Sequence, residues 1–199
     1  MEPTGGDLLD LSVREFLEAV ATELPTPGGG SAAALAVAVS AALTAMVSRA
    51  SVDWHDAGSA VAQAHRIQKR VEPLVQLDAE AYEEALVTLA LPERLEPAVR
   101  DMAVGGALSR AAQVPMAIAE AGADAACLAA VVADLGIADR RGDAVAAALL
   151  AEAGTRAAAA LVVVNLTVQP GDERSNRAEL LAQTAADAAR EALRTIHPA

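Results

Sequence analysis

Alanine is the residue that most limits what this chain can fold into. The 199-residue sequence contains 52 alanines but only one Trp, one Tyr and one Phe. This content argues against a β-sandwich or barrel, whose strands need branched and aromatic side chains at alternate positions. It favours helices that pack closely through small side chains. At this length we predict one domain over residues 1–199, with a core that needs no disulfide or metal for stability.

Apolar residues recur at helical spacing, and prolines and glycines separate the repeats into five or six helices. Ser12 and Glu15 have the spacing of a capping box at the start of the first helix, which Pro25 ends. We expect Pro115 and Gly122 to bend or divide the fourth helix. The expected fold is an all-α, mostly antiparallel bundle. The predicted helices cover residues 13–24, 28–49, 59–90, 93–135, 143–168 and 176–196.

The charge of the chain bears on its partners and location. A net charge of −12 argues against nucleic-acid binding and against attraction to anionic lipid. The single cysteine, Cys127, excludes an internal disulfide and favours a reducing compartment, and the N-terminus has no basic segment typical of a signal peptide. The uncharged stretch 24–48 is long enough to span a bilayer, but its two prolines and three glycines argue against it. We therefore expect a cytoplasmic protein without a membrane or nucleic-acid partner.

The string PTPGGGSAAA, residues 25–34, is the first feature that could carry chemistry. Its glycines at a helix start expose amide donors and allow close approach of a ligand, which suits a carboxylate or phosphate. No Gly-Lys-Ser/Thr follows, so a phosphate-binding P-loop is excluded. The same residues are equally typical of a helix start with a small packing face. The candidate binding residues are Gly28, Gly29, Gly30 and Ser31.

Two carboxylates and two arginines are further candidates. Asp143 follows a glycine at the start of an apolar helix, where it would be an N-cap. Asp78 lies in an apolar helical stretch, where a partly buried carboxylate could exchange protons. A plain cap and a solvated helix residue are the alternatives for these two positions. Arg140 and Arg141 could hold an anionic substrate group, although most arginines only solubilise a surface. The three histidines lack metal-ligand spacing, so we expect no metal.

Four segments together resemble one known family. Residues 16–48 contain PTPGGGSAAAL, and residues 77–92 read LDAEAYEEALVTLALP. They are followed by AAQVPMAIAEAG at 111–122 and by GDAVAAALLAEAGTRAAAALVVVNL at 142–166. In order and spacing the sequence is similar to the C-terminal region of the formiminotransferase-cyclodeaminase family, over nearly the whole chain.

The resemblance implies a helical homodimer that acts on a one-carbon tetrahydrofolate without a metal or other cofactor. Family members either hydrolyse 5,10-methenyltetrahydrofolate to 10-formyltetrahydrofolate or close 5-formiminotetrahydrofolate with release of ammonia. No formiminotransferase region accompanies the motifs in this sequence, which favours the cyclohydrolase. We expect Asp143 and Asp78 to stabilise the cationic bridge and relay a proton. They should converge with Arg140 or Arg141, which would hold the glutamate tail, near the glycines.

The sequence also departs from the family at polar positions. Many members carry a lysine after the second helix, where this chain has Ser51 to His55 without one. His55 is therefore a candidate proton carrier. Many members also carry an aspartate where this chain has Gln76. These changes favour an alternative, a catalytically altered helical dimer that binds a folate-like small anion or a partner protein.

Overall fold

The fold is helical throughout the described part of the chain. The computed structural model describes residues 6–90, 96–167, 169 and 171–196, and those ranges contain no strand. Within these ranges six long helices form the bundle, which agrees with the predicted all-α fold, and the eight-residue α1 precedes them. Two three-residue 3-10 helices, η1 (Leu8–Asp10) and η2 (Ala138–Arg140), complete the order. The α-helices are α1 (Val13–Val20), α2 (Gly29–Ala50), α3 (Ala57–Leu89), α4 (Pro97–Ala111), α5 (Gln113–Leu135), α6 (Arg141–Asn165) and α7 (Glu173–Arg194).

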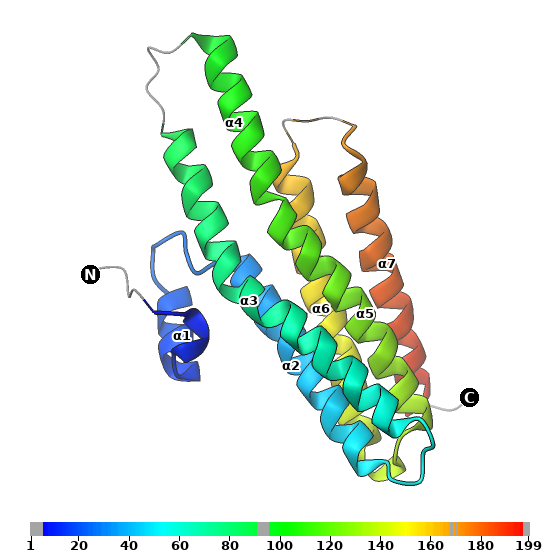
Figure 1. Cartoon of the computed structure of the whole chain (residues 1–199). Helices are drawn as coiled ribbons and strands as arrows, with labels where there is room; N and C mark the ends of the chain where they lie inside the picture. Colours follow the sequence, from blue (N-terminus) through cyan, green and yellow to red (C-terminus); the bar gives the residue numbers. More distant parts are fainter. Residues whose placement is uncertain (1–5, 91–95, 168, 170, 197–199) are drawn as a thin grey trace.

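The long helices run back and forth along one axis (Figure 1). α2 descends to a short loop, α3 returns, α4 and α5 descend together, α6 returns and α7 descends again. The start of α2 and the end of α6 therefore lie at the same end of the bundle. The loop between α2 and α3 lies at the opposite end, where the N–H of Ile137 donates to Oγ of Ser51 at 2.8 Å.

Proline and capping residues set several helix boundaries. The capping box of α1 is present: Oγ of Ser12 accepts from the N–H of Glu15 at 3.2 Å, and Oε2 of Glu15 accepts from the N–H of Ser12 at 2.7 Å. The fourth predicted helix is divided at Ala112, because the ring of Pro115 crowds the carbonyl four residues earlier and Pro115 has no N–H to donate. The first helix is shorter than predicted and ends at Val20. The predicted helix start at residue 93 lies outside the described residues.

Small side chains allow the central helices to approach closely. The interior faces of α2, α5 and α6 consist largely of fully buried alanines, such as Ala34, Ala126 and Ala148. A Cβ added to Gly154 of α6 would lie 2.8 Å from Cγ2 of Val37 and 3.0 Å from the carbonyl oxygen of Ala33, so only glycine fits where α6 meets α2. The bundle is thus stabilised by many small apolar contacts rather than by a few large side chains.

In the part of the chain that the structure describes, three helical stretches are long and apolar enough to cross a membrane, judged by length and composition alone. They are Gly29–Ala50, Ala98–Leu135 and Ala138–Asn165. In the folded chain, 61%, 67% and 44% of their most apolar windows are buried against other helices. Packing inside the bundle thus accounts for much of their apolar character.

Candidate active site

A cavity of about 290 Å³ lies at the end of the bundle where α2 begins and α6 ends. Four segments line it: the glycine turn before α2, the second half of α3, the last turn of α6 and the junction between α4 and α5. The structure thus brings the glycine turn and the half-buried carboxyl of Asp78 together, although they are far apart in the sequence. The lining residues are Pro25, Thr26, Gly28, Gly29, Gly30, Asp78, Tyr82, Ala111, Pro115, Leu161, Val164 and Asn165.

The glycine turn is held against α3 by a side-chain hydrogen bond. Oγ1 of Thr26 donates to Oε1 of Glu83 at 2.5 Å. Gly28 is the N-cap residue of α2 and has no side chain to cap the first turn, so the first amides of α2 depend on other acceptors. The carboxyl of Asp78 is one such acceptor, because the backbone N–H of Ser31 donates to it.

The carboxyl of Asp78 occupies the space that a side chain at Gly30 would need. A Cβ added to Gly30 would overlap the Oδ1, Cγ and Oδ2 atoms of Asp78, so the carboxyl lies directly against the glycine Cα. Burial raises the pKa of Asp78 above its ordinary value, and the hydrogen bond from Ser31 opposes this with a smaller lowering. Oγ of Ser31 is itself buried without a hydrogen-bond partner among the described residues. The turn therefore creates a protected carboxyl with an increased tendency to hold a proton.

The other polar side chains of the cavity are Tyr82 and Asn165. Tyr82 is one helical turn beyond Asp78 on α3, so their shared face follows from the i, i+4 spacing. Asn165 is the last residue of α6. Neither residue is a candidate from the sequence. No local signal links Asn165 to Asp78, because only the packing of the bundle brings α6 to this cavity. The remaining lining is mostly apolar, which suits a flat ring with a polar edge.

Asp143 lies far from Asp78, and its predicted position as an N-cap is wrong. The N-cap of α6 is Arg140, and Asp143 is in the first turn. Asp143 and Asn165 are at opposite ends of α6, 22 residues apart (165 − 143), which at 1.5 Å per residue is about 33 Å. Within one chain, Asp143 and Asp78 cannot act on the same bound group. The expected convergence of the two carboxylates is therefore not found in a single chain.

The other predicted polar residues lie at the Asp143 end of the bundle. The side chain of His55 is 99% exposed in the loop after α2, 3.9 Å from Asp56. Arg140 is exposed in η2, and Nε of Arg141 donates to the carbonyl of Ala133 at 3.1 Å. The 22-residue length of α2 separates this loop from the glycine turn. The stretch without the family lysine is accordingly remote from the cavity of the same chain.

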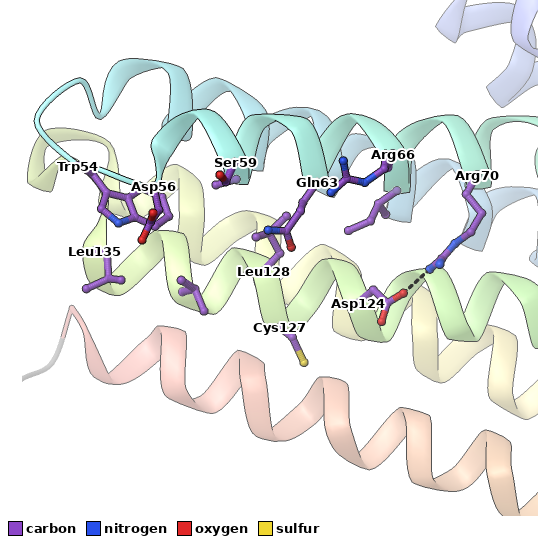
Figure 2. A pocket seen from close by; sticks show the side chains of 13 residues that line it. Trp54, Asp56, Ser59, Gln63, Arg66, Arg70, Asp124, Cys127, Leu128 and Leu135 are labelled. Carbon is purple, nitrogen blue, oxygen red and sulfur yellow. Dashed lines mark hydrogen bonds and ion pairs between the residues drawn. The ribbon is translucent and has the colours of Figure 1, made fainter.

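A larger, more open groove of about 850 Å³ lies between α3 and α5 (Figure 2). Nη2 of Arg70 and Oδ2 of Asp124 form an ion pair across it at 2.5 Å, and both side chains are about half exposed. Cys127 is exposed here. Partial burial of its thiol, and then the charges of Asp124 and Glu191, raise the pKa of Cys127, so it is poorly suited to act as a thiolate. The groove has the larger volume, whereas the smaller cavity contains the half-buried carboxyl of Asp78.

Comparisons with known proteins give a consistent result. The family model described as formiminotransferase-cyclodeaminase matches residues 12–185. A methenyltetrahydrofolate cyclohydrolase of Methylorubrum extorquens is 31% identical over 163 residues, which cover 77% of this chain and 78% of the relative. The formimidoyltransferase-cyclodeaminases of rat and mouse are 34% identical over 123 residues, 57% of this chain and 23% of theirs.

A solved structure shares the fold. It is a formiminotetrahydrofolate cyclodeaminase from Thermotoga maritima, with a TM-score of 0.81 and 24% sequence identity. The match covers 95% of this chain and 98% of that one. Nearly all of the helical arrangement described above is therefore common to both proteins.

Proposed function

This chain belongs to the formiminotransferase-cyclodeaminase family, and on that premise we propose that it is an enzyme of one-carbon folate metabolism. The proposed reaction is hydrolysis of 5,10-methenyltetrahydrofolate to 10-formyltetrahydrofolate. The related cyclodeaminase reaction, ring closure of 5-formiminotetrahydrofolate with loss of ammonia, is the second candidate. The cyclohydrolase is favoured because the relative with that name matches most of both chains. The observation that carries the proposal is the half-buried carboxyl of Asp78 against Gly30 in an otherwise largely apolar cavity.

The proposed hydrolysis needs one group that first takes and then gives a proton. Water adds to the bridging carbon between N5 and N10, and the ionised carboxylate of Asp78 accepts a proton from that water. The tetrahedral intermediate then breaks its N5–carbon bond. Asp78 returns the proton to N5, and the hydroxyl proton of the intermediate leaves to solvent as the formyl group forms. A carboxyl whose pKa is raised by burial is better matched to both transfers than a solvated one.

The same carboxyl could serve the second candidate reaction. Attack of N10 on the formimino carbon gives a comparable tetrahedral centre, in which the carboxylate of Asp78 takes the proton that N10 loses. The leaving nitrogen must then be protonated to depart as ammonia. Asp78 would then act as the acid. The two reactions differ in substrate, so they are separable by assay.

The test follows loss of the 5,10-methenyltetrahydrofolate absorbance, with uncatalysed opening subtracted. Wild type is compared with Asp78→Asn and with the control Asp134→Asn, an exposed carboxyl on α5. Loss of turnover in Asp78→Asn alone supports the cyclohydrolase. Turnover of 5-formiminotetrahydrofolate alone would favour the cyclodeaminase. If wild type binds both compounds without converting either, the non-catalytic alternative replaces the proposal.

One of the changed positions that favour a catalytically altered binding protein has a structural use in this chain. Oε1 of Gln76 accepts from the N–H of Leu8 at 3.1 Å, and its Nε2 donates to Glu80 at 3.0 Å. Gln76 thus fastens η1 to α3. Its presence in place of an aspartate accordingly has a structural explanation, and the enzyme is the better supported reading.

We propose that the reaction needs no metal or other cofactor. Among the described residues, no three His, Cys, Asp or Glu side chains gather where they could share an ion. The cavity itself presents a single carboxyl, which is a poor donor set for a divalent metal. Dialysis against a chelator should leave the rate unchanged, and restoration of a lost rate by added metal would contradict the proposal.

We also propose that the enzyme is a homodimer. Large apolar side chains are exposed on the hairpin of α3 and α4, notably Val87 (74%), Val99 (54%) and Met102 (79%). Exposed apolar side chains of this size suit contact with another protein surface. Light scattering should give twice the chain mass, and Met102→Glu should shift the equilibrium toward the monomer. A monomeric wild type would refute this.

The proposed setting is the cytoplasm, without a nucleic-acid or membrane partner. The net charge of −12 supports this, since both of those surfaces are anionic. Cell fractionation should place the protein in the fraction that contains neither membrane nor nucleic acid. Sedimentation with membranes would contradict the proposal.

A further inference from the structure

The two walls that flank the start of α2 differ in chemistry. Gly30 faces Asp78 on the α3 side, whereas Gly29 faces the α6 side, where a Cβ would lie 4.0 Å from Cδ1 of Leu161. The α3 wall thus carries the ionisable group. The α6 wall consists of Leu161 and Val164, which are apolar, and of Asn165, whose amide is uncharged.

Asn165 is held on a firmly anchored piece of backbone. It ends α6, and the next residue, Leu166, is only 3% exposed. The N–H of Leu166 donates to the carbonyl of Val162 at 3.1 Å, and the carbonyl of Leu166 accepts from the N–H of Gln169 at 2.8 Å. These two hydrogen bonds fix the backbone that follows Asn165 at the end of α6. A side chain placed in this way is suited to recognise a ligand in one orientation.

An amide differs from the other polar groups of the cavity in what it can do. It offers one acceptor and two donors at every working pH, so it can pair with a ring edge that has a donor beside an acceptor, but it cannot relay a proton. The hydroxyl of Thr26 is engaged with Glu83. The cavity, at about 290 Å³, is at the lower end of ligand-pocket sizes and has room for a bicyclic ring rather than a whole folate.

We propose that Asn165 is a specificity-determining residue that pairs with the N3–H and C4 carbonyl edge of the pteridine ring. Leu161 and Val164 would contact the face of the ring, and this placement would bring the one-carbon bridge to Asp78. The inference rests on the proposed function, because it assumes a folate-type substrate. It adds that the two helices have different roles: α6 recognises the ring, and α3 supplies the group that transfers the proton.

The test separates ring recognition from turnover by using two fragments of the substrate. Binding of 6-methyltetrahydropterin, which has the ring only, and of p-aminobenzoylglutamate, which lacks it, is measured by anaerobic calorimetry. Variants are Asn165→Leu, the smaller Asn165→Ala in case leucine disturbs folding, and the control Asn176→Leu, an exposed asparagine in the first turn of α7. Melting curves establish that each variant is folded.

We expect Asn165→Leu and Asn165→Ala to weaken binding of the pterin fragment by roughly ten- to a hundredfold, the effect of losing one or two hydrogen bonds. Binding of p-aminobenzoylglutamate should be unchanged. With the full substrate, KM should rise more than kcat falls, whereas Asp78→Asn should mainly lower kcat. Unchanged pterin binding in a folded variant, or a fall in kcat alone, would overturn the role of Asn165. A wild type that turns over neither folate would instead refute the proposed function.

Discussion

The two ends of the bundle contain similar polar residues in very different surroundings. Where α2 begins and α6 ends, Asp78 is half-buried against Gly30, and burial raises its pKa. Where α2 ends and α6 begins, Asp143 lies in a first helical turn and His55 is almost fully exposed. Residue type alone therefore does not make a site. A carboxyl becomes useful for proton transfer where the fold removes it from water and leaves room beside it for a ligand.

The largest effect should come from Asp78→Asn. The amide keeps the shape of the side chain but cannot accept and return a proton, so we expect kcat/KM to fall by about 10²- to 10⁴-fold. Steady-state kinetics with the better of the two folate substrates measures this. A loss of less than about threefold would mean that the protected carboxyl is not the proton carrier.

The second effect concerns the glycine that faces the carboxyl. Gly30→Ala introduces a Cβ that overlaps Asp78, so either the carboxyl or the turn must move. We expect about tenfold lower activity and a loss of about 1–3 kcal/mol in the free energy of unfolding. The control is Gly142→Ala at the opposite end, where a Cβ would meet nothing within 4 Å. If both variants retain full activity, the cavity tolerates displacement of Asp78. The position of this carboxyl would then not distinguish the two ends of the bundle in function.

The third effect is on stability as a function of pH. The pKa of Asp78 is raised above 3.8 in the folded chain, so the folded state binds this proton more tightly than the unfolded state. The resulting stabilisation is complete below 3.8 and is lost as the pH rises through the raised pKa. The Asp78→Asn variant has no carboxyl at this position, so it does not lose this stabilisation as the pH rises. Urea unfolding should therefore show the variant gaining stability relative to wild type as the pH is raised to neutral, and a difference that is constant with pH would indicate a solvated Asp78.

The smallest effect should come from the opposite end. Asp143→Asn and His55→Gln should each change kcat/KM by less than about twofold, because about 33 Å separates that end from the cavity of the same chain. This outcome would replace the sequence-based expectation that Asp143 is catalytic. A loss comparable to that of Asp78→Asn would mean instead that Asp143 of a second copy reaches the cavity. Activity measured below and above the dissociation concentration of the dimer would separate these cases.

Local sequence signals anticipated much of the fold. The capping box at Ser12 and Glu15 depends only on neighbouring residues, and so does the break that Pro115 causes between α4 and α5. The glycine turn was identifiable because three glycines before a small-residue helix permit close approach. What these signals could not indicate is which group approaches, since Asp78 is 48 residues beyond Gly30 in the numbering.

Local patterns in the sequence are enough to predict alanine-packed helices and to identify the glycine turn and Asp78 as candidates. Helical periodicity specifies which face of a helix is apolar, and capping and proline residues specify where the helix begins and ends. Which ends of the helices meet depends instead on how the helices pack together. Helices of 22 and 25 residues hold their two ends about 30 Å or more apart. The antiparallel order of the helices therefore places Asp78 and Asn165 in one cavity and Asp143 at the far end of the bundle. This arrangement depends on packing across the whole bundle.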